Sequence, residues 1–324
     1  MVIVTLIEAI NKALNFALQH DENVIILGED VGKNGGVFRA TVGLQEKFPD
    51  RVLDVPLAEN MIAGISVGMA ACGLIPVAEI QFMGFLYSAL DQIISHASRM
   101  RIRTQGRLSC PMVIRTPYGG GIHAPEHHSE STEAMLAHIP GIRVVVPSSP
   151  SMAYGLLLAS IFDPDPVIFL ESTRLYRLFK QEINDNGKKL PLDVCFIVQE
   201  GKDVTLVSWG AMLHETLAAA AELHKNNISA EVIDVVTIKP LDLDTILQSV
   251  AKTGRCVIIH EAAKSYGVGA EIAAGLADQG LTSLVAPIKR VTGFDTIIPP
   301  YRLEETYLPS VDRILKAVKE VLEY

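Results

Sequence analysis

Glu59 is the residue whose setting in this chain most suggests chemistry. It begins a long uncharged stretch, because no charged residue occurs from Asn60 to Ala78. A lone carboxylate in apolar surroundings has a raised pKa and is suited to proton transfer. A structural explanation exists too, since Pro56 fits the first turn of a helix and an acidic residue three places later complements the helix dipole. The local sequence leaves both interpretations open.

A second candidate lies in the stretch YGGGIHAPEHHSES at residues 118–131. Three consecutive glycines and a proline predict a loop, and His123, His127 and His128 fall within it. The H-x₃-H-H spacing could supply metal ligands, but it matches no zinc motif and no thiol is nearby. The remaining interpretations are ordinary surface histidines and a histidine that exchanges protons near neutral pH.

An alternation of helices and strands must position these residues. Continuously apolar strands indicate parallel sheets covered on both faces by helices. In the first part of the chain we expect strands at 23–30, 74–82, 111–117, 142–148 and 165–172, and helices at 4–20, 87–104 and 152–162. In the second part we expect strands at 204–210, 228–235 and 255–261, and a closing helix at 309–322.

The polar stretch 180–203 is the expected linker between two domains. The sequence therefore predicts an α/β protein of two three-layer domains with mostly parallel sheets, one over residues 1–185 and one over 200–324. In the second domain, His260 and Glu261 are expected to form a buried hydrogen-bonded pair at the end of a strand, with a role near a subunit contact as the alternative.

Composition narrows the class of protein. The 324 residues fit two domains, and the net charge of −9 without a basic run argues against a nucleic-acid partner. The stretch 60–78 is long enough to span a membrane, but Gly64, Gly68, Gly73 and Pro76 interrupt it. We expect it to form a buried helix, a turn and a strand, and we expect no membrane partner. The N-terminus does not read as a signal peptide, and the four cysteines form no C-x-x-C pair. We therefore expect buried, reduced thiols and a cytoplasmic location.

Six stretches together resemble one family. In chain order they are ILGEDVGKNGGVFRAT, LDVPLAEN, GISVGMAACGLIPVAEIQF, HHSES, PGIRVVVPSSP and RVTGFDT, and the match runs from about residue 4 to the C-terminus. They are similar to the β subunit of the thiamine-diphosphate-dependent E1 component of 2-oxo acid dehydrogenases. The resemblance implies a pyrimidine-binding domain followed by a transketolase C-terminal-like domain.

The resemblance also implies roles for single residues. Glu59 would exchange a proton with N1′ of the cofactor's aminopyrimidine, and Leu57, Gln81 and Phe85 would line that ring. His128 would orient the substrate and donate a proton as the acyl group moves to a lipoyl group. His127 stands where some members have Gln or Tyr. In SIFDPDPVIF, Asp163 matches a region that holds a potassium ion largely through main-chain carbonyls, although an ordinary Asp-Pro turn explains it equally well.

One signature of a complete thiamine enzyme is missing. The sequence contains no Gly-Asp-Gly, with which such enzymes bind the magnesium ion and the diphosphate. The resemblance therefore implies that an E1 α subunit supplies this half of the site in an α₂β₂ heterotetramer, and that the chain alone is inactive. It also implies docking to the binding domain of the E2 lipoyl acyltransferase, with the chain terminus Leu322–Tyr324 as a candidate contact.

The substrate is less sharply indicated. GEDVGKNGGVFRAT favours pyruvate, but other motifs also occur in branched-chain members that act on 2-oxoisovalerate. A nicotinamide enzyme is disfavoured because no G-x-G-x-x-G opens a helix. A self-sufficient transketolase is disfavoured by the chain length. A non-catalytic scaffold subunit is the remaining alternative, although Glu59, Phe85 and His128 occurring together speak against it.

Overall fold

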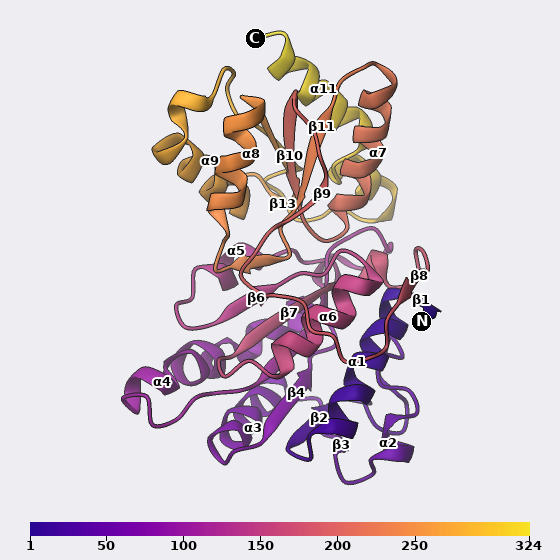
Figure 1. Ribbon diagram of the computed structural model, residues 1–324. Helices are drawn as coiled ribbons and strands as arrows, with labels where there is room; N and C mark the ends of the chain where they lie inside the picture. Colours follow the sequence, from indigo (N-terminus) through magenta and orange to yellow (C-terminus); the bar gives the residue numbers. More distant parts are fainter.

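The computed structural model describes residues 1–324, and its backbone forms two large sheets and one two-stranded sheet (Figure 1). The first sheet has seven strands in the order β12-β6-β7-β5-β4-β2-β3, all parallel except β12. Its strands are β2 (Val24–Gly28), β3 (Val52–Asp54), β4 (Ile75–Glu79), β5 (Val113–Tyr118), β6 (Arg143–Val145), β7 (Val167–Ser172) and β12 (Thr237–Lys239).

Helices cover both faces of this sheet, because successive side chains of a strand point to opposite sides. Ile26 and Val77 belong to one core, together with the helices α1 (Leu6–His20) and α6 (Pro150–Ile161). Leu27 and Ala78 belong to the other core, together with α3 (Glu59–Ala71). The expected three-layer arrangement is confirmed, as are the helix, turn and strand expected over residues 60–78.

The starts of α1 and α6 follow from their sequences. Thr5 and Glu8 form a reciprocal capping box at the first turn of α1. Ser149 accepts a hydrogen bond from the amide of Met152, and Pro150 occupies the first turn of α6. The short helices α2 (Leu44–Lys47) and α5 (Glu133–Ala137) lie in the connections of the same domain.

The single helix expected at 87–104 is wrong. The chain instead forms a 3₁₀ turn at Met83–Ala89, a π turn at Gln92–His96, a second 3₁₀ turn at Ala97–Arg99 and the short α4 (Met100–Arg103). A π turn adds one residue and so rotates the side chains that follow it. Here Ile93 is buried in the core, while the side chain of Gln92 lies against Gly64 of α3. In a regular helix, different side chains would have to occupy these two positions.

The second sheet has five strands in the order β14-β13-β10-β11-β9. The antiparallel edge strand is β9 (Phe196–Gln199), and the parallel strands are β10 (Val204–Ser208), β11 (Ala230–Asp234), β13 (Cys256–Ala263) and β14 (Lys289–Gly293). On one face lie α7 (Met212–Lys225) and α11 (Val311–Leu322), and on the other α8 (Leu243–Thr253) and α9 (Val268–Gln279) (Figure 1). A short α10 (Glu304–Tyr307) precedes α11.

Two strand pairings connect distant parts of the chain. β1 (Val2–Val4) pairs with β8 (Gln181–Ile183), which lies within the expected linker. β12 comes from the second half of the chain but pairs with β6 in the first sheet. The exact domain limits of 1–185 and 200–324 stay a prediction. No helix has the length and apolar character needed to cross a membrane.

Candidate active site

The candidate residues gather at the carboxyl ends of the parallel strands of the first sheet, where ligands bind in open α/β folds. Glu29 follows β2, Glu59 lies just beyond β3, and Gln81 follows β4. The glycine-rich stretch that leads to His128 follows β5. Sequence positions a hundred residues apart therefore meet at one edge.

Glu59 is the first residue of α3 and is half-buried. The hydroxyl of Ser88 lies 3.3 Å from its Oε2 and 3.0 Å from the carbonyl oxygen of Phe85, so it can donate to either. The expectation of purely apolar surroundings is wrong, because a hydroxyl and a second carboxyl group are near. Ser88 also places Glu59 beside the segment that carries Phe85.

That second carboxyl group is Glu29. Its pKa is raised by burial, and further by the negative charges of Asp30 and Glu59. Its Oε2 atom is buried without a hydrogen-bond partner. The sequence signal was a strand that ends in two acids, but nothing local indicates that Glu29 and Glu59 interact.

Three aromatic rings form the next part of the site. His128 lies 4.3 Å from Phe82 and 5.3 Å from Phe85 between ring centroids, in edge-on arrangements, and the two phenylalanines are 5.6 Å apart. Edge-on contacts of this kind are favourable between aromatic rings. The Nδ1 atom of His128 is buried and has no partner within the chain. The structure thus brings His128 and Phe85 together and adds Phe82, which the sequence analysis did not single out.

A glycine allows the histidine stretch to pack this closely. A Cβ atom on Gly84 would lie 2.3 Å from the carbonyl oxygen of His127, which is far inside van der Waals contact. Any larger residue at position 84 would push the stretch away from the turn that carries Phe82 and Phe85.

Comparison with known proteins bears on this site. Residues 3–178 match the family model described as transketolase, pyrimidine binding domain, and residues 194–314 match transketolase, C-terminal domain. Over 321 residues, covering 99% of both chains, the sequence is 48% identical to the pyruvate dehydrogenase E1 component subunit beta of Bacillus subtilis (strain 168). The corresponding protein of Staphylococcus aureus (strain Mu50) is 46% identical over the same coverage.

The chain belongs to the family of pyruvate dehydrogenase E1 β subunits.

A solved structure supports the fold. The chain resembles a protein described as a split gene transketolase, inactive β4 tetramer, with a TM-score of 0.81 and 23% identity, covering 99% of this chain and 98% of that one. The family and this likeness agree with two α/β domains of the transketolase type, as the sequence predicted.

The other two expected cofactor contacts, Leu57 and Gln81, lie near the site in the chain. Leu57 lies in the connection between β3 and α3 and is 64% exposed. Gln81 lies two residues beyond the end of β4 and is half-buried, next to Phe82 in the sequence. Their roles in an E1 β subunit stay predictions. The exposure of Leu57 means that the wall on its side of the site is open in the single chain.

The expected pair of His260 and Glu261 is wrong. As neighbours in β13 they point to opposite sides of the sheet. His260 stacks on Trp209 with 5.1 Å between ring centroids, and both of its ring nitrogens are buried without partners. Glu261 accepts a hydrogen bond of 3.2 Å from the amide of Gly120, and burial together with the charge of Glu133 raises its pKa to about 8.

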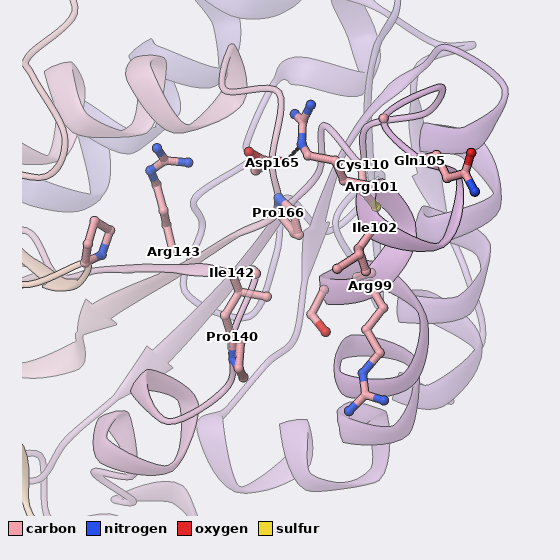
Figure 2. A pocket seen from close by; sticks show the side chains of 15 residues that line it. Arg99, Arg101, Ile102, Gln105, Cys110, Pro140, Ile142, Arg143, Asp165 and Pro166 are labelled. Atoms are coloured by element: carbon pink, nitrogen blue, oxygen red, sulfur yellow. Dashed lines mark hydrogen bonds and ion pairs between the residues drawn. The ribbon is translucent and has the colours of Figure 1, made fainter.

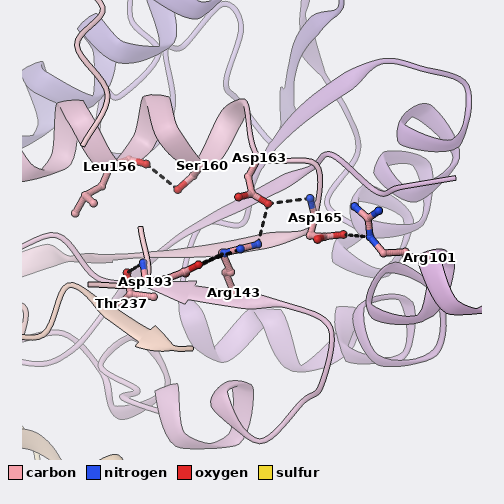
Figure 3. Close-up of polar contacts among 8 residues, drawn as sticks. All are labelled: Arg101, Arg143, Leu156, Ser160, Asp163, Asp165, Asp193 and Thr237. Atoms are coloured by element: carbon pink, nitrogen blue, oxygen red, sulfur yellow. Dashed lines mark hydrogen bonds and ion pairs between the residues drawn. The ribbon is translucent and has the colours of Figure 1, made fainter. Parts of the chain in front are cut away.

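Asp163 lies at the opposite edge of the sheet, because it precedes β7 rather than following it. Its Oδ1 accepts hydrogen bonds of 2.9 Å from Arg143 Nη1 and from the amide of Asp165, and Asp165 pairs with Arg101 at 2.8 Å (Figure 3). The carboxylate of Asp163 therefore already has a cationic partner. A potassium ion would have to be held by main-chain carbonyl groups of this turn instead.

A groove of about 1030 Å³ opens beside this turn (Figure 2), and Glu59 is not among the residues that line it. Arg101 and Arg143 line it, but both already form ion pairs, and Arg143 pairs with Asp193 at 3.0 Å as well as with Asp163. The groove therefore does not present these guanidinium groups as a free anion site.

The cysteines differ in one respect from the expectation. Cys110, Cys195 and Cys256 are buried free thiols, but Cys72, at the end of α3, is exposed.

Proposed function

We propose that this chain is the β subunit of a pyruvate dehydrogenase E1 that works only with an α subunit, in an α₂β₂ heterotetramer. One observation carries the proposal: Glu59, Phe85 and His128 are gathered at the carboxyl edge of a sheet of the pyrimidine-binding type. A scaffold subunit would have no need of such a combination.

The residues present fit the aminopyrimidine half of thiamine diphosphate. Glu59 and Glu29 provide carboxyl groups on one side of the site, and Phe82 and Phe85 provide aromatic rings. The buried Nδ1 atom of His128 has no partner within the chain and can hydrogen-bond to a bound molecule. When bound, thiamine diphosphate supplies the carbon nucleophile and the electron sink for loss of carbon dioxide. The missing Gly-Asp-Gly leaves magnesium and diphosphate binding to the α subunit.

Each residue then has a defined task. Glu59 would hold and exchange a proton at the aminopyrimidine of the bound cofactor, which is general acid–base catalysis by a carboxyl group. Phe85 supports the ring face, with Leu57 and Gln81 beside it. His128 binds the substrate side and donates a proton when the acetyl group moves to the lipoyl group of E2. The α subunit closes the side that Leu57 leaves exposed and so excludes water.

The face of α3 that carries Gly68 supports a subunit contact, whereas Gly64 already packs against Gln92 of the same chain. Gly68 is exposed, and a Cβ atom added there would meet no other atom. Ile65, on the same helix, is 38% exposed. A small, uncharged helix face of this kind permits close approach of another helix.

A structural potassium ion held by carbonyl groups at residues 160–165 is a further part of the proposal. Thermal unfolding of the assembled enzyme in potassium chloride and in tetramethylammonium chloride at equal ionic strength tests it. A melting temperature that is the same in both salts would remove the ion from the proposal.

The main experiment mixes this chain with the E1 α subunit of the same organism. Thiamine diphosphate binding with Mg²⁺ and turnover of pyruvate to an artificial acceptor are measured for each chain alone and for the mixture. We expect binding and turnover only in the mixture, and pyruvate preferred over 2-oxoisovalerate. Preference for 2-oxoisovalerate would favour the branched-chain alternative. An assembled complex without cofactor binding would favour the scaffold alternative.

A further inference from the structure

The histidine loop, defined here as residues 119–128, connects the end of β5 with His128. Its three glycines make it intrinsically flexible, and Gly119 and Gly121 adopt φ values of +87° and +90° that other residues rarely adopt. His123, in the same loop, also has a positive φ, of +60°, although it is not a glycine. A non-glycine residue in this region is held there only when its surroundings fix it.

The contacts that fix His123 come from the second domain. Glu304, at the start of α10, is 2% exposed. Its Oε1 accepts a hydrogen bond of 2.7 Å from the amide of Gly121, and its Oε2 accepts 3.1 Å from the amide of His123. The Nδ1 atom of His123 lies 2.7 Å from the same Oε2. Both oxygens of one buried carboxylate are therefore used on two residues of the loop.

The surroundings leave the loop little room. A Cβ atom on Gly120 would lie 2.6 Å from Cδ1 of Ile298 and 3.3 Å from Oε1 of Glu304. The ring of Tyr301 lies edge-on to His123 with 4.3 Å between ring centroids. The segment 298–304 of the second domain thus packs directly on the first half of the loop.

The second half of the loop can transmit this restraint to His128. Between His123 and His128 the chain forms one short 3₁₀ turn, closed by hydrogen bonds of 2.9 Å from the amide of His128 to Pro125 and of 3.0 Å from the amide of Ser129 to Glu126. A proline followed by a closed turn has few free dihedral angles.

We propose that Glu304 is a positioning residue for the active site: its carboxylate fixes the start of the histidine loop so that His128 stays edge-on to Phe82 and Phe85. The inference deepens the proposed function and rests on it for the task of His128. It makes the second domain a part of the catalytic machinery through its hold on the loop.

The test uses Glu304→Gln in the assembled α₂β₂ enzyme. The glutamine keeps the size but has only one acceptor oxygen, so its NH₂ group faces a backbone donor of the loop. We expect kcat for acetyl transfer to lipoyl-E2 to fall about tenfold or more with KM for pyruvate changed little, because a small misplacement of a catalytic group costs rate. Glu305→Gln is the matched control, since Glu305 is the exposed neighbour in the same helix.

Amide hydrogen exchange separates positioning from general destabilisation. In Glu304→Gln we expect faster exchange at 119–128 with unchanged exchange in β5 and α11. This readout does not depend on turnover, so it tests the restraint on the loop even if the wild-type assembly decarboxylates no 2-oxo acid. Wild-type exchange in the loop, or kcat equal to that of Glu305→Gln, would overturn the proposal.

A second variant covers the case in which Glu304→Gln fails to fold. His123→Ala removes a side chain that is 48% exposed and keeps the buried carboxylate. Through loss of its ring contact with Glu304 it should also speed exchange in the loop and lower kcat for acetyl transfer. Unchanged values for both would equally reject the inference.

Discussion

The imidazole of His128 lies edge-on to the phenyl ring of Phe85, with 5.3 Å between centroids and 77° between planes. Phe85 is in turn connected to Glu59, because the hydroxyl of Ser88 can donate to the carbonyl of one or the carboxylate of the other. Glu59, proposed to exchange a proton, and His128, proposed to act in acyl transfer, are thus placed by the same short turn after β4. A disturbance of that turn should affect both.

Glu59→Gln should abolish pyruvate decarboxylation by the assembled enzyme and leave assembly intact. Glutamine can still hydrogen-bond, but it cannot carry the proton, and loss of a general acid–base group typically costs ~10²–10⁴ in rate. Turnover is measured with an artificial acceptor, and assembly by sedimentation. Glu22→Gln, an exposed carboxylate of the same domain, is the control. Activity of Glu59→Gln within a few-fold of this control would refute the assigned role.

His128→Ala should harm acetyl transfer to lipoyl-E2 more than decarboxylation with an artificial acceptor. The Nδ1 atom of His128 has no partner within the chain, and the proposed function assigns His128 to the lipoyl step and Glu59 to the earlier one. The two assays are run on the same preparation, with His224→Ala on the outer surface of α7 as the control. Equal losses in both assays would instead assign His128 to substrate binding or to structure.

Stability should fall as the pH rises toward 8, in part because of Glu261. Burial raises the pKa of this carboxyl group to about 8 in the folded chain, whereas it is near 4.3 in an unfolded chain. Between these values the folded state binds more protons than the unfolded state, so the free energy of unfolding decreases with pH. Its contribution is complete below the unfolded pKa and lost as the pH passes the folded one.

Glu261→Gln isolates this effect, since the amide oxygen can still accept from Gly120. Melting temperatures measured from pH 5 to pH 8 should decline less steeply in the variant. A residual slope is expected, because burial also raises the pKa of Asp234, to about 7. Parallel curves for the wild type and the variant would contradict the assignment to Glu261.

Deleting Leu322–Tyr324 should weaken binding to the E2 binding domain and spare E1 activity. Helix α11 holds the end of the chain in place through buried Ile314, Val318 and Val321, while Tyr324 is 81% exposed. A carboxylate group within Leu322–Tyr324, held in place by α11, can pair with an arginine of a basic partner. Affinity is measured by calorimetry at low and moderate salt. An unchanged dissociation constant at both would exclude the terminus as a docking contact.

Local patterns predicted the site in part. Continuous apolar runs located the strands, and the family resemblance singled out Phe85 and the role of His128, but neither predicted the edge where Glu59, Phe85 and His128 meet. The same runs could not predict Glu304, because it lies far along the chain from the loop that it holds and nothing near it in sequence indicates that contact. Phe82 was within reach, since it precedes Phe85 by three residues and this spacing places side chains on the same side of a turn.

The errors have physical causes of the same kind. The expected helix at 87–104 is divided because Ile93 packs into the core whereas the adjacent Gln92 packs against Gly64 of α3. Helical periodicity in the sequence alone does not reveal these two contacts. His260 and Glu261 were paired because they are adjacent, although adjacent strand residues face apart. The separation of Asp163 from the catalytic edge follows once β7 is known to be parallel to β4 and β5.

The pairing of β12 with β6 sets an order of events for a chain made from its N-terminus. On that side β6 has no neighbour until Thr237–Lys239 has been synthesised, when β9, β10 and β11 of the second sheet already exist. An open strand edge is a template for unwanted pairing. The first domain is thus left one strand short on the ribosome until much of the second has emerged, so the two domains cannot be completed strictly one after the other.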